Sequence, residues 1–358
     1  MINKTKLFSI DSTELKNKLS FIKKVIGKGY VYLTKKDNLL YLTSKNEQKS
    51  IITRVKPKEL DIKFSFGIDL DVLYRVCSNK KILHFYQQNS SIYFCDDKSY
   101  SGTIALVDYL KIDIKTKDIN FIPINSLLPY LEKTKIDDII GEESSTLSFL
   151  IRDRGVAVLS MYHAAYLEKD LDIKNEVNIP TDYLDIIKAI QKDSGGKKDN
   201  TINIGMSNNI IILSTGETLI GLQQIAEPRI GFDQIKKLKK CMYETKDFEC
   251  IIDHKSLQSI VNSMYALYSD KHIHVNIKSE KTGLLLSMST EKGTISDRVK
   301  ISKKKYNRDV NIFIDYKILM NIIKKFDIDP VFRVYNGKIF NFNSDTKYYK
   351  LNYFAMSF

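Results

Sequence analysis

The side chains that could coordinate a metal are few and scattered. The five histidines are His84, His163, His254, His272 and His274. His272 and His274 alternate within a predicted strand, so their side chains would share one face of a sheet. Zinc sites need three or four ligands, and no third carboxylate or cysteine lies near this pair in sequence. We therefore expect a surface pair of histidines there and no metal.

Nucleophiles and phosphate-binding loops are equally hard to find. The four cysteines, Cys77, Cys95, Cys241 and Cys250, form no CxxC pair, which indicates a reducing compartment without disulfides. The sequence contains neither GxxxxGK[ST] nor GxGxxG. The acidic pairs Asp96–Asp97 and Asp137–Asp138 lie in turn-like sequence, unlike an acid and base that share a face. We predict that the chain is not an enzyme and binds no cofactor.

Composition narrows the class of protein further. The chain has 358 residues, of which 43% are hydrophobic and 28% charged, as in globular proteins with real cores. It shows no apolar stretch long enough for a membrane span and no secretory signal, so we expect no membrane partner and a cytoplasmic location. The net charge is +13, which favours an anionic partner, nucleic acid first. An AT-rich genome, which encodes lysine freely, explains part of that excess.

A local pattern of short strand, polar capping residue and amphipathic helix recurs six times along the chain. The aligned strand ends are Ile10, Ile68, Ile124, Pro180, Ile252 and Ile314. The capping residues that follow are Asp11, Asp69, Asn125, Thr181, Asp253 and Asp315. Each has a side-chain oxygen that can accept from the free N–H groups of a first helical turn. Such a repeat predicts one supersecondary unit used six times.

Each predicted helix is followed by alternating apolar and polar residues, typical of a hairpin and a third strand. The unit is therefore strand–helix–strand–strand–strand, about 60 residues long, which buries too little surface alone. Pairing the units predicts three domains at 1–117, 118–242 and 243–358. The fold class is α+β, with helices on one face of antiparallel sheets. A six-bladed propeller is the alternative, although its blades need no helix.

The helices carry basic residues on the face opposite their apolar stripe. Counting 100° per residue places Lys24, Arg75, Lys133, Lys192, Lys255, Lys317 and Lys324 on those faces. Solvent-facing helices carry lysine in many proteins, so this pattern alone does not decide the function. Phosphate contacts from such a surface would bind nucleic acid in a salt-sensitive way and without reading sequence.

Six strand–helix units, three domains and basic helical faces together resemble a DNA sliding clamp. The nearest design is the bacterial DNA polymerase III β-subunit, which also has three domains in about this length. The C-terminal YYKLNYFAMSF resembles that family's closing strand, which ends Met-Pro-Met-Arg-Leu, with Phe354, Ala355 and Met356 at the Met and Pro positions. Lys28 falls where the family has a basic DNA-contacting loop residue.

A second stretch, VAVLSMYHAAYLEKDL, resembles the family's Thr-Asp-Gly-His-Arg-Leu-Ala segment. His163 matches the His and Ala165 the Leu, whereas Tyr162 and Ala164 depart from the Gly and Arg. The segment IGFDQIKKLKK stands where the family has a Tyr-Arg-Arg linker. The departures suggest a divergent clamp, such as a phage-encoded one in the cytoplasm of a bacterial host.

The resemblance implies a DNA polymerase processivity factor that encircles duplex DNA as a head-to-tail homodimer. It also implies a partner-peptide pocket that tethers the polymerase, with a clamp loader as a further partner. The pocket residues would be Leu159, Met161, Tyr162, His163, Ala165, Leu238, Phe354, Ala355 and Met356. The dimer interface would use Ile104, Leu106, Leu267 and Tyr268, beside strands 101–106 and 294–299. The alternatives are a basic monomeric or open processivity or transcription accessory factor and an RNA-binding repeat protein.

Overall fold

The computed structural model groups the chain into two compact units. Unit 1 comprises Met1–Ser126 and Tyr183–Gln224, and unit 2 comprises Leu127–Asp182 and Ile225–Phe358. The residues described are 5–77, 82–117, 119, 121–123, 127–136, 147–160, 163–171, 176–193, 202–207, 210–224, 232–241, 243–244, 246–269, 272–306 and 308–357. The two units are described separately below.

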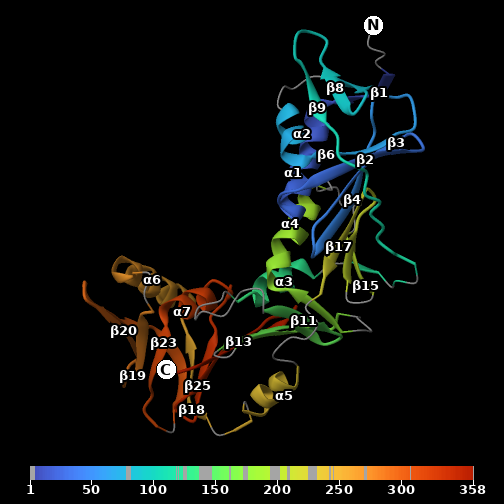
Figure 1. Ribbon diagram of the computed structural model, residues 1–358. Coiled ribbons are helices and arrows are strands. Elements are labelled where there is room, and N and C mark those ends of the chain that lie inside the picture. Colours follow the sequence, from blue (N-terminus) through green and yellow to red (C-terminus); the bar gives the residue numbers. More distant parts are fainter. Residues whose placement is uncertain are drawn as a thin grey trace. The chain divides into compact units, whose positions relative to one another are not determined.

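Six strand–helix repeats are present, as the sequence predicts (Figure 1). The first is β1 (Thr5–Asp11), α1 (Ser12–Ile26), β2 (Tyr30–Lys36), β3 (Leu39–Lys45) and β4 (Lys49–Val55). The second is β6 (Ser65–Asp69), α2 (Leu70–Val76), β7 (Ile82–Gln88), β8 (Ser91–Cys95) and β9 (Ser101–Ala105). The third is β10 (Ile122–Pro123), α3 (Leu128–Thr134), β11 (Ser148–Arg152), β12 (Gly155–Leu159) and β13 (His163–Glu168).

The later repeats keep the same order and add small elements. The fourth is β14 (Val177–Pro180), the 3-10 turn η2 (Thr181–Tyr183), α4 (Leu184–Asp193), β15 (Asn203–Ser207), β16 (Ile210–Ser214) and β17 (Thr218–Gln223). The fifth is β18 (Lys246–Ile252), α6 (His254–Met264), η3 (Tyr265–Leu267), β19 (His274–Ser279), β20 (Leu284–Thr290) and β21 (Gly293–Val299). The sixth is β23 (Asn311–Asp315), α7 (Tyr316–Ile323), β24 (Val331–Tyr335), β25 (Ile339–Asp345) and β26 (Lys350–Met356). Outside the repeats lie β5 (Glu59–Leu60), α5 (Phe232–Cys241) and β22 (Ile301–Tyr306).

Four of the predicted capping residues hold the first turn of their helix. The Asp11 carboxylate accepts from the backbone N–H groups of Thr13 and Glu14, and the other aspartates, Asp69, Asp253 and Asp315, do the same for their helices. Thr181 is the first residue of η2, and Asn125 lies outside the described residues. These bonds satisfy donors that a helix cannot pair internally.

Consecutive repeats exchange their first strands. β1 of the first repeat pairs with β7 of the second, and β6 of the second pairs with β2 of the first. The same reciprocal pairing joins β14 with β11 and β10 with β15, and then β18 with β24 and β23 with β19. The repeats are therefore interlocked in twos, which explains why one alone would be unstable. The three-domain division stays a prediction.

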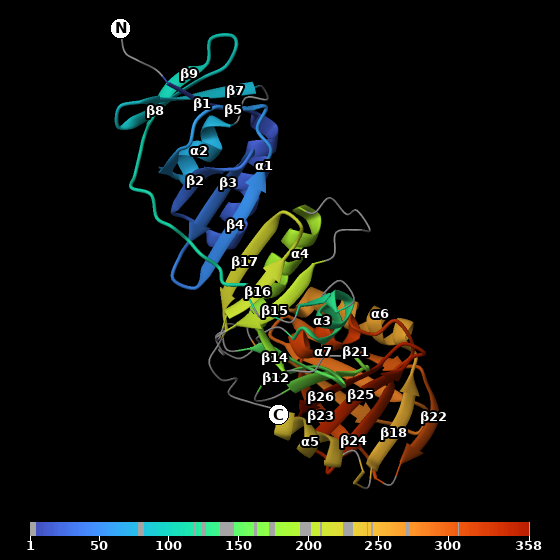
Figure 2. The same ribbon diagram turned by 90° about the vertical axis from the view of Figure 1, so that its right-hand side faces the viewer.

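The last strands of the repeats join these pairs into larger sheets. In unit 1, β17 pairs with β4 and completes an eight-stranded sheet ordered β10-β15-β16-β17-β4-β3-β2-β6. In unit 2, β13 pairs with β26 in the nine-stranded sheet β14-β11-β12-β13-β26-β25-β24-β18-β22 (Figure 2). The last strands of the second and fifth repeats, β9 and β21, form sheet edges within their own units.

The helices of the repeats cover one face of these sheets. In unit 1, α1 contacts α2, α4 and β4 and buries Leu15, Leu19 and Ile22. In unit 2, α6 contacts α7, and α3 contacts β12 and β13. The fold class predicted from the sequence, α+β with helices on one face of antiparallel sheets, is confirmed. No helix among the described residues has both the length and the apolar character to cross a membrane.

Candidate nucleic-acid interface and partner groove

Seven of the eight predicted DNA-contacting side chains are exposed to solvent. Lys24 lies in α1, Arg75 in α2 and Lys192 in α4, and Lys28 follows α1. In unit 2 the exposed cations are Lys255 in α6, Lys317 in α7 and Lys324 at the end of α7. Each unit thus carries several cations on the free surface of its helices, where a phosphate backbone could reach them.

Acidic groups on the helices of unit 1 are partly neutralised from within. Asp71 on α2 forms an ion pair with Lys23 of α1, and the hydrogen bond from Lys23 lowers the pKa of that carboxyl. The Nζ atoms of Lys23 and Lys16 lie 4.6 and 5.4 Å from the ring centre of Tyr74. Lys23 thus offsets Asp71, whereas Glu14 of α1 and Asp185 of α4 are exposed acids on the same helices as Lys24 and Lys192.

Lys133 differs from the other predicted contacts. Its side chain is only 23% exposed, and its Nζ lies 2.5 Å from an oxygen of Asp327. The same Nζ donates to the backbone oxygen of Lys325 at 3.0 Å. Its charge joins α3 to the end of α7, and a contact of Lys133 with DNA stays a prediction.

The predicted pocket residues of unit 2 lie on both faces of the nine-stranded sheet. Ala164 pairs with Phe354, so Phe354 shares a face with Leu159, and the exposed Met356 follows on that face. His163, Ala165 and Ala355 alternate with them and point to the opposite, helix-covered face. The predicted set is therefore divided between the two faces, and its role as a partner pocket stays a prediction. Met161 and Tyr162 lie outside the described residues, and Leu238 lies in α5.

A groove of about 500 Å³ lies on the Phe354 face of this sheet. Its floor comes from β13, β24, β25 and β26 and its side from α5 and the residues after it. The lining includes Tyr166, Glu168, Lys239, Arg333, Asn352 and Phe354. The groove therefore combines an aromatic end with ionised side chains, which suits an extended peptide better than a small apolar ligand.

Ion pairs fix the charged side chains around this groove. Lys239 donates to the Tyr166 hydroxyl at 3.2 Å and to Glu168. Burial alone would lower the pKa of Lys239, but these hydrogen bonds outweigh it and raise that pKa. Burial would raise the pKa of Glu249, yet Arg333 and Lys246 beside it lower that pKa. Both groups are therefore charged at neutral pH.

The predicted interface residues lie near the two free sheet edges. Ile104 is buried within β9, and Leu106 follows that strand half-buried. Leu267 and Tyr268 lie in and after η3, which contacts β20 and β21. The Tyr268 ring packs against Tyr316 of α7 with ring centres 5.0 Å apart and planes tilted by 30°, so it also supports α7.

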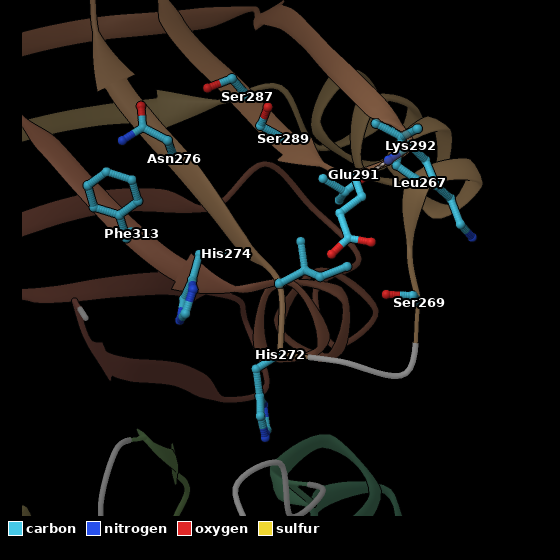
Figure 3. A pocket seen from close by; sticks show the side chains of 12 residues that line it. Leu267, Ser269, His272, His274, Asn276, Ser287, Ser289, Glu291, Lys292 and Phe313 are labelled. Carbon is cyan, nitrogen blue, oxygen red and sulfur yellow. Dashed lines mark hydrogen bonds between the residues drawn. The ribbon is translucent and has the colours of Figure 1, made fainter.

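A second hollow, of about 690 Å³, lies beside the β21 edge on the four-stranded sheet β21-β20-β19-β23. Figure 3 shows Phe313, Asn276 and His274 on one side of it and Leu267, Glu291 and Lys292 on the other. The histidines expected to form a surface pair, His272 and His274, are both exposed here. Within the part of the chain that the structure describes, no three His, Cys, Asp or Glu residues are grouped to hold a metal.

The structure also brings a serine, a histidine and an aspartate side chain within hydrogen-bonding distance of one another in series, which the sequence does not reveal. Ser9 Oγ lies 2.8 Å from His84 Nδ1, and His84 Nε2 lies 2.8 Å from an oxygen of Asp97. Ser9 is 1% exposed and also donates to Glu59 at 2.9 Å. A nucleophile must reach its substrate, and this hydroxyl is enclosed between strands. The hydrogen bonds of Ser9 therefore join β1 to β5 and β7, and these side chains do not form an active site.

Comparison with known proteins finds similarity in structure but not in sequence families. No protein-family model matches the sequence, and no curated protein matches it. Among solved structures, a protein of Eubacterium rectale described as a DNA polymerase III β subunit has a TM-score of 0.83 at 14% identity, with 99% of each chain covered. A DNA polymerase sliding clamp of Pseudomonas aeruginosa has a TM-score of 0.82 at 12% identity, again over 99% of each chain.

A third similar structure is the β subunit of DNA polymerase III from Thermotoga maritima, with a TM-score of 0.77 at 14% identity over 99% of each chain. These likenesses extend over the whole length of the chains, so they include all six repeats. The chain therefore has the fold of the bacterial β sliding clamps.

Proposed function

We propose that this protein is a sliding clamp that holds a DNA polymerase on duplex DNA without reading base sequence. The observation that carries the proposal is the clamp fold over the whole chain, with exposed cations on the free faces of its helices. The protein would act as a tether in the cytoplasm, in a bacterial host if a phage encodes it. It would catalyse no reaction and require no cofactor.

A head-to-tail homodimer is part of the proposal, and the way the repeats pair supports it. Within the chain, the last strand of the fourth repeat pairs with that of the first, and the last strand of the third pairs with that of the sixth. The same rule leaves β9 and β21 to pair with a second copy. β9 (Ser101–Ala105) has no charged residue and no bulge, as expected of an edge that pairs. Heterologous contacts of this kind close into a ring when the rotation fits.

The ring is tested by light scattering and by retention on DNA. We expect a dimer at micromolar concentration that stays on circular DNA and slides off when the circle is cut. Leu267→Lys should give monomers, because a charge would be buried beside β21. Tyr348→Lys is the matched control, since Tyr348 is 66% exposed and far in sequence from both edges. A stable monomer that binds linear and circular DNA equally would instead support an open accessory factor.

The groove beside Phe354 is proposed as the site where polymerase docks, with a clamp loader as a further partner. Its support is the combination of exposed apolar Met356, buried Phe354 and fixed charges on one sheet face. Replacing Asn352, which lines the groove and is 2% exposed, by Leu should weaken polymerase binding while leaving DNA retention unchanged. Retained polymerase binding after this change would place the docking site elsewhere.

A further inference from the structure

The helix α5 is the one described helix that belongs to none of the six repeats. It lies on the far side of the nine-stranded sheet from α3, α6 and α7 (Figures 1 and 2). Its described side chains are mostly exposed, including Asp233, Lys236, Lys237 and Lys240. Such a helix adds little to the core of unit 2, so its position needs another explanation.

Among the side chains described in α5, Ile235 packs against the sheet. Ile235 is 4% exposed and packs in a cluster whose other members are Leu150, Ala157, Leu159, Ala164, Tyr166 and Phe354. The strand register puts all of the sheet residues in that cluster on the groove face. Ile235 is the member that α5 contributes to this cluster, which we call the apolar socket.

A second contact lies one helical turn further along α5. Lys239 donates to the Tyr166 hydroxyl and to Glu168, and its Nζ lies 4.3 Å from the Tyr166 ring centre. Residues four apart share a helix face, so Ile235 and Lys239 together form the docking face of α5. Tyr166, Glu168 and Lys239 also line the groove, which makes the helix part of one wall.

We propose that α5 covers a binding site for a partner, namely the apolar socket in which Ile235 packs. α5 must leave this socket before the partner binds there. The socket would accept an amphipathic segment with an aliphatic side chain followed, one helical turn later, by lysine or arginine. This inference rests on the proposed function only in assigning the groove to a partner. The occupant seen in the structure defines the chemistry, since helix-in-groove recognition uses apolar anchors at this spacing.

The restraint that α5 provides is intramolecular, so a partner competes against a high effective concentration of the helix. Affinity for any partner falls by the fraction of molecules in which the socket is open. Among the α5 side chains that the structure describes, the contacts with the sheet are those of Ile235 and Lys239, and such contacts can be broken without unfolding the sheet. α5 would thus keep the apolar socket covered until a segment of matching chemistry arrives.

The test uses a synthetic peptide with the sequence of residues 232–243 and methyl NMR of the full-length chain. In an Ile235→Asp chain we expect the peptide to shift the methyl signals of Leu150 and Leu159. Its binding should be about tenfold tighter than to the parent chain, where α5 competes. A peptide carrying the same Ile-to-Asp change should bind about tenfold more weakly, because it lacks the anchor. Lys237→Asp, on the exposed side of α5, is the control chain and should behave like the parent.

Equal affinity for the parent and Ile235→Asp chains would overturn the proposal, as would equal shifts by the two peptides or none. If Ile235→Asp lowers the melting temperature of the whole chain, Ile235→Ala replaces it and the same comparisons apply. Neither DNA nor polymerase enters the experiment. The peptide experiment can therefore support displacement of α5 even if the protein forms no rings. It can equally refute displacement of α5 in a protein that does form rings.

Discussion

The salt dependence of DNA binding should reveal which helical cations contact phosphate. We consider the triple change Lys24→Gln, Lys28→Gln and Lys192→Gln, which removes three exposed charges from unit 1. Each phosphate contact contributes about 0.9 to the slope of log K against log salt for duplex DNA. Losing three contacts should therefore reduce the slope by about 2.7.

The structure also sets the scale for the unmodified protein. Seven exposed helical cations predict a slope near −6 and a loss of several thousandfold in affinity between about 50 and 200 mM salt. The triple variant should lose about 40-fold less over the same range. Fluorescence anisotropy of a labelled linear duplex, titrated at several salt concentrations, measures both slopes. The expected change is well above the error of such titrations.

A control variant with the same net charge separates the effect of where the lysines lie from the effect of the total charge. Lys63, Lys98 and Lys115 are also exposed in unit 1, but they lie neither in its helices nor, like Lys28, next to a helix end. Their triple change to glutamine should leave the slope nearly unaltered. If both triple variants reduce the slope equally, the helical cations contribute no more to DNA binding than other exposed lysines. Binding would then depend on the total charge of the protein. If neither does, DNA lies elsewhere.

Four further outcomes follow from local structure. Gly155→Ala should lower the melting temperature strongly, because φ is +147° there and a Cβ would collide with a carbonyl oxygen of β13; an unchanged melting curve would contradict this packing. Asp253→Ala should cost about 1 kcal/mol of unfolding free energy in denaturant titrations by removing the cap of α6. Burial raises the pKa of the Cys250 thiol to about 12, so a thiol reagent at pH 8 should label it only as the chain unfolds. Hydrogen bonds from Lys6 and Ser9 lower the pKa of Glu59, so its contribution is present above pH 4.5 and lost on acidification; Glu59→Gln should flatten the acid side of the stability profile.

The repeat could be predicted because its signals are local. A capping aspartate, an apolar stripe and alternating strands each depend on a few neighbouring residues, and Asp11 and Asp315 cap helices as their positions indicate. The exchange of first strands between repeats could not be predicted in this way. The pairing of β1 with β7 joins residues more than seventy positions apart, and either repeat offers strands of similar pattern.

The partner groove shows how a small alignment difference changes a site. Matching His163 and Ala165 to a family motif assigns them to the pocket, yet Ala164 and Tyr166 share the groove face with Phe354. Since side chains alternate along a strand, a shift by one residue moves every side chain to the other face. Short motifs at low identity do not determine which residues of a strand face the groove. The register of β13 against β26 determines it.

The helix α5 was missed for a different reason. The segment IGFDQIKKLKK reads as a polar, lysine-rich boundary because Ile235, which is buried in the structure, has charged neighbours in the sequence. Its docking site comes from β11, β12, β13 and β26, which are distant in sequence. The local signs were spacings of three and four among Phe232, Ile235, Leu238 and Lys239, which many exposed helices have.

The excess positive charge of the chain has more than one structural origin, and this limits what net charge implies about function. Strand β22 is an edge of the nine-stranded sheet, and Lys303 and Lys305 on it are exposed. Its register shifts opposite Cys250, and Lys303 has a φ of +50°, as in a bulge. Lysines and bulges on an edge prevent other chains from pairing with it. β9 has neither feature, so one edge is protected while the other stays open to pairing. The charge on β22 thus belongs to the control of assembly, and only cations on the free helical faces argue for DNA.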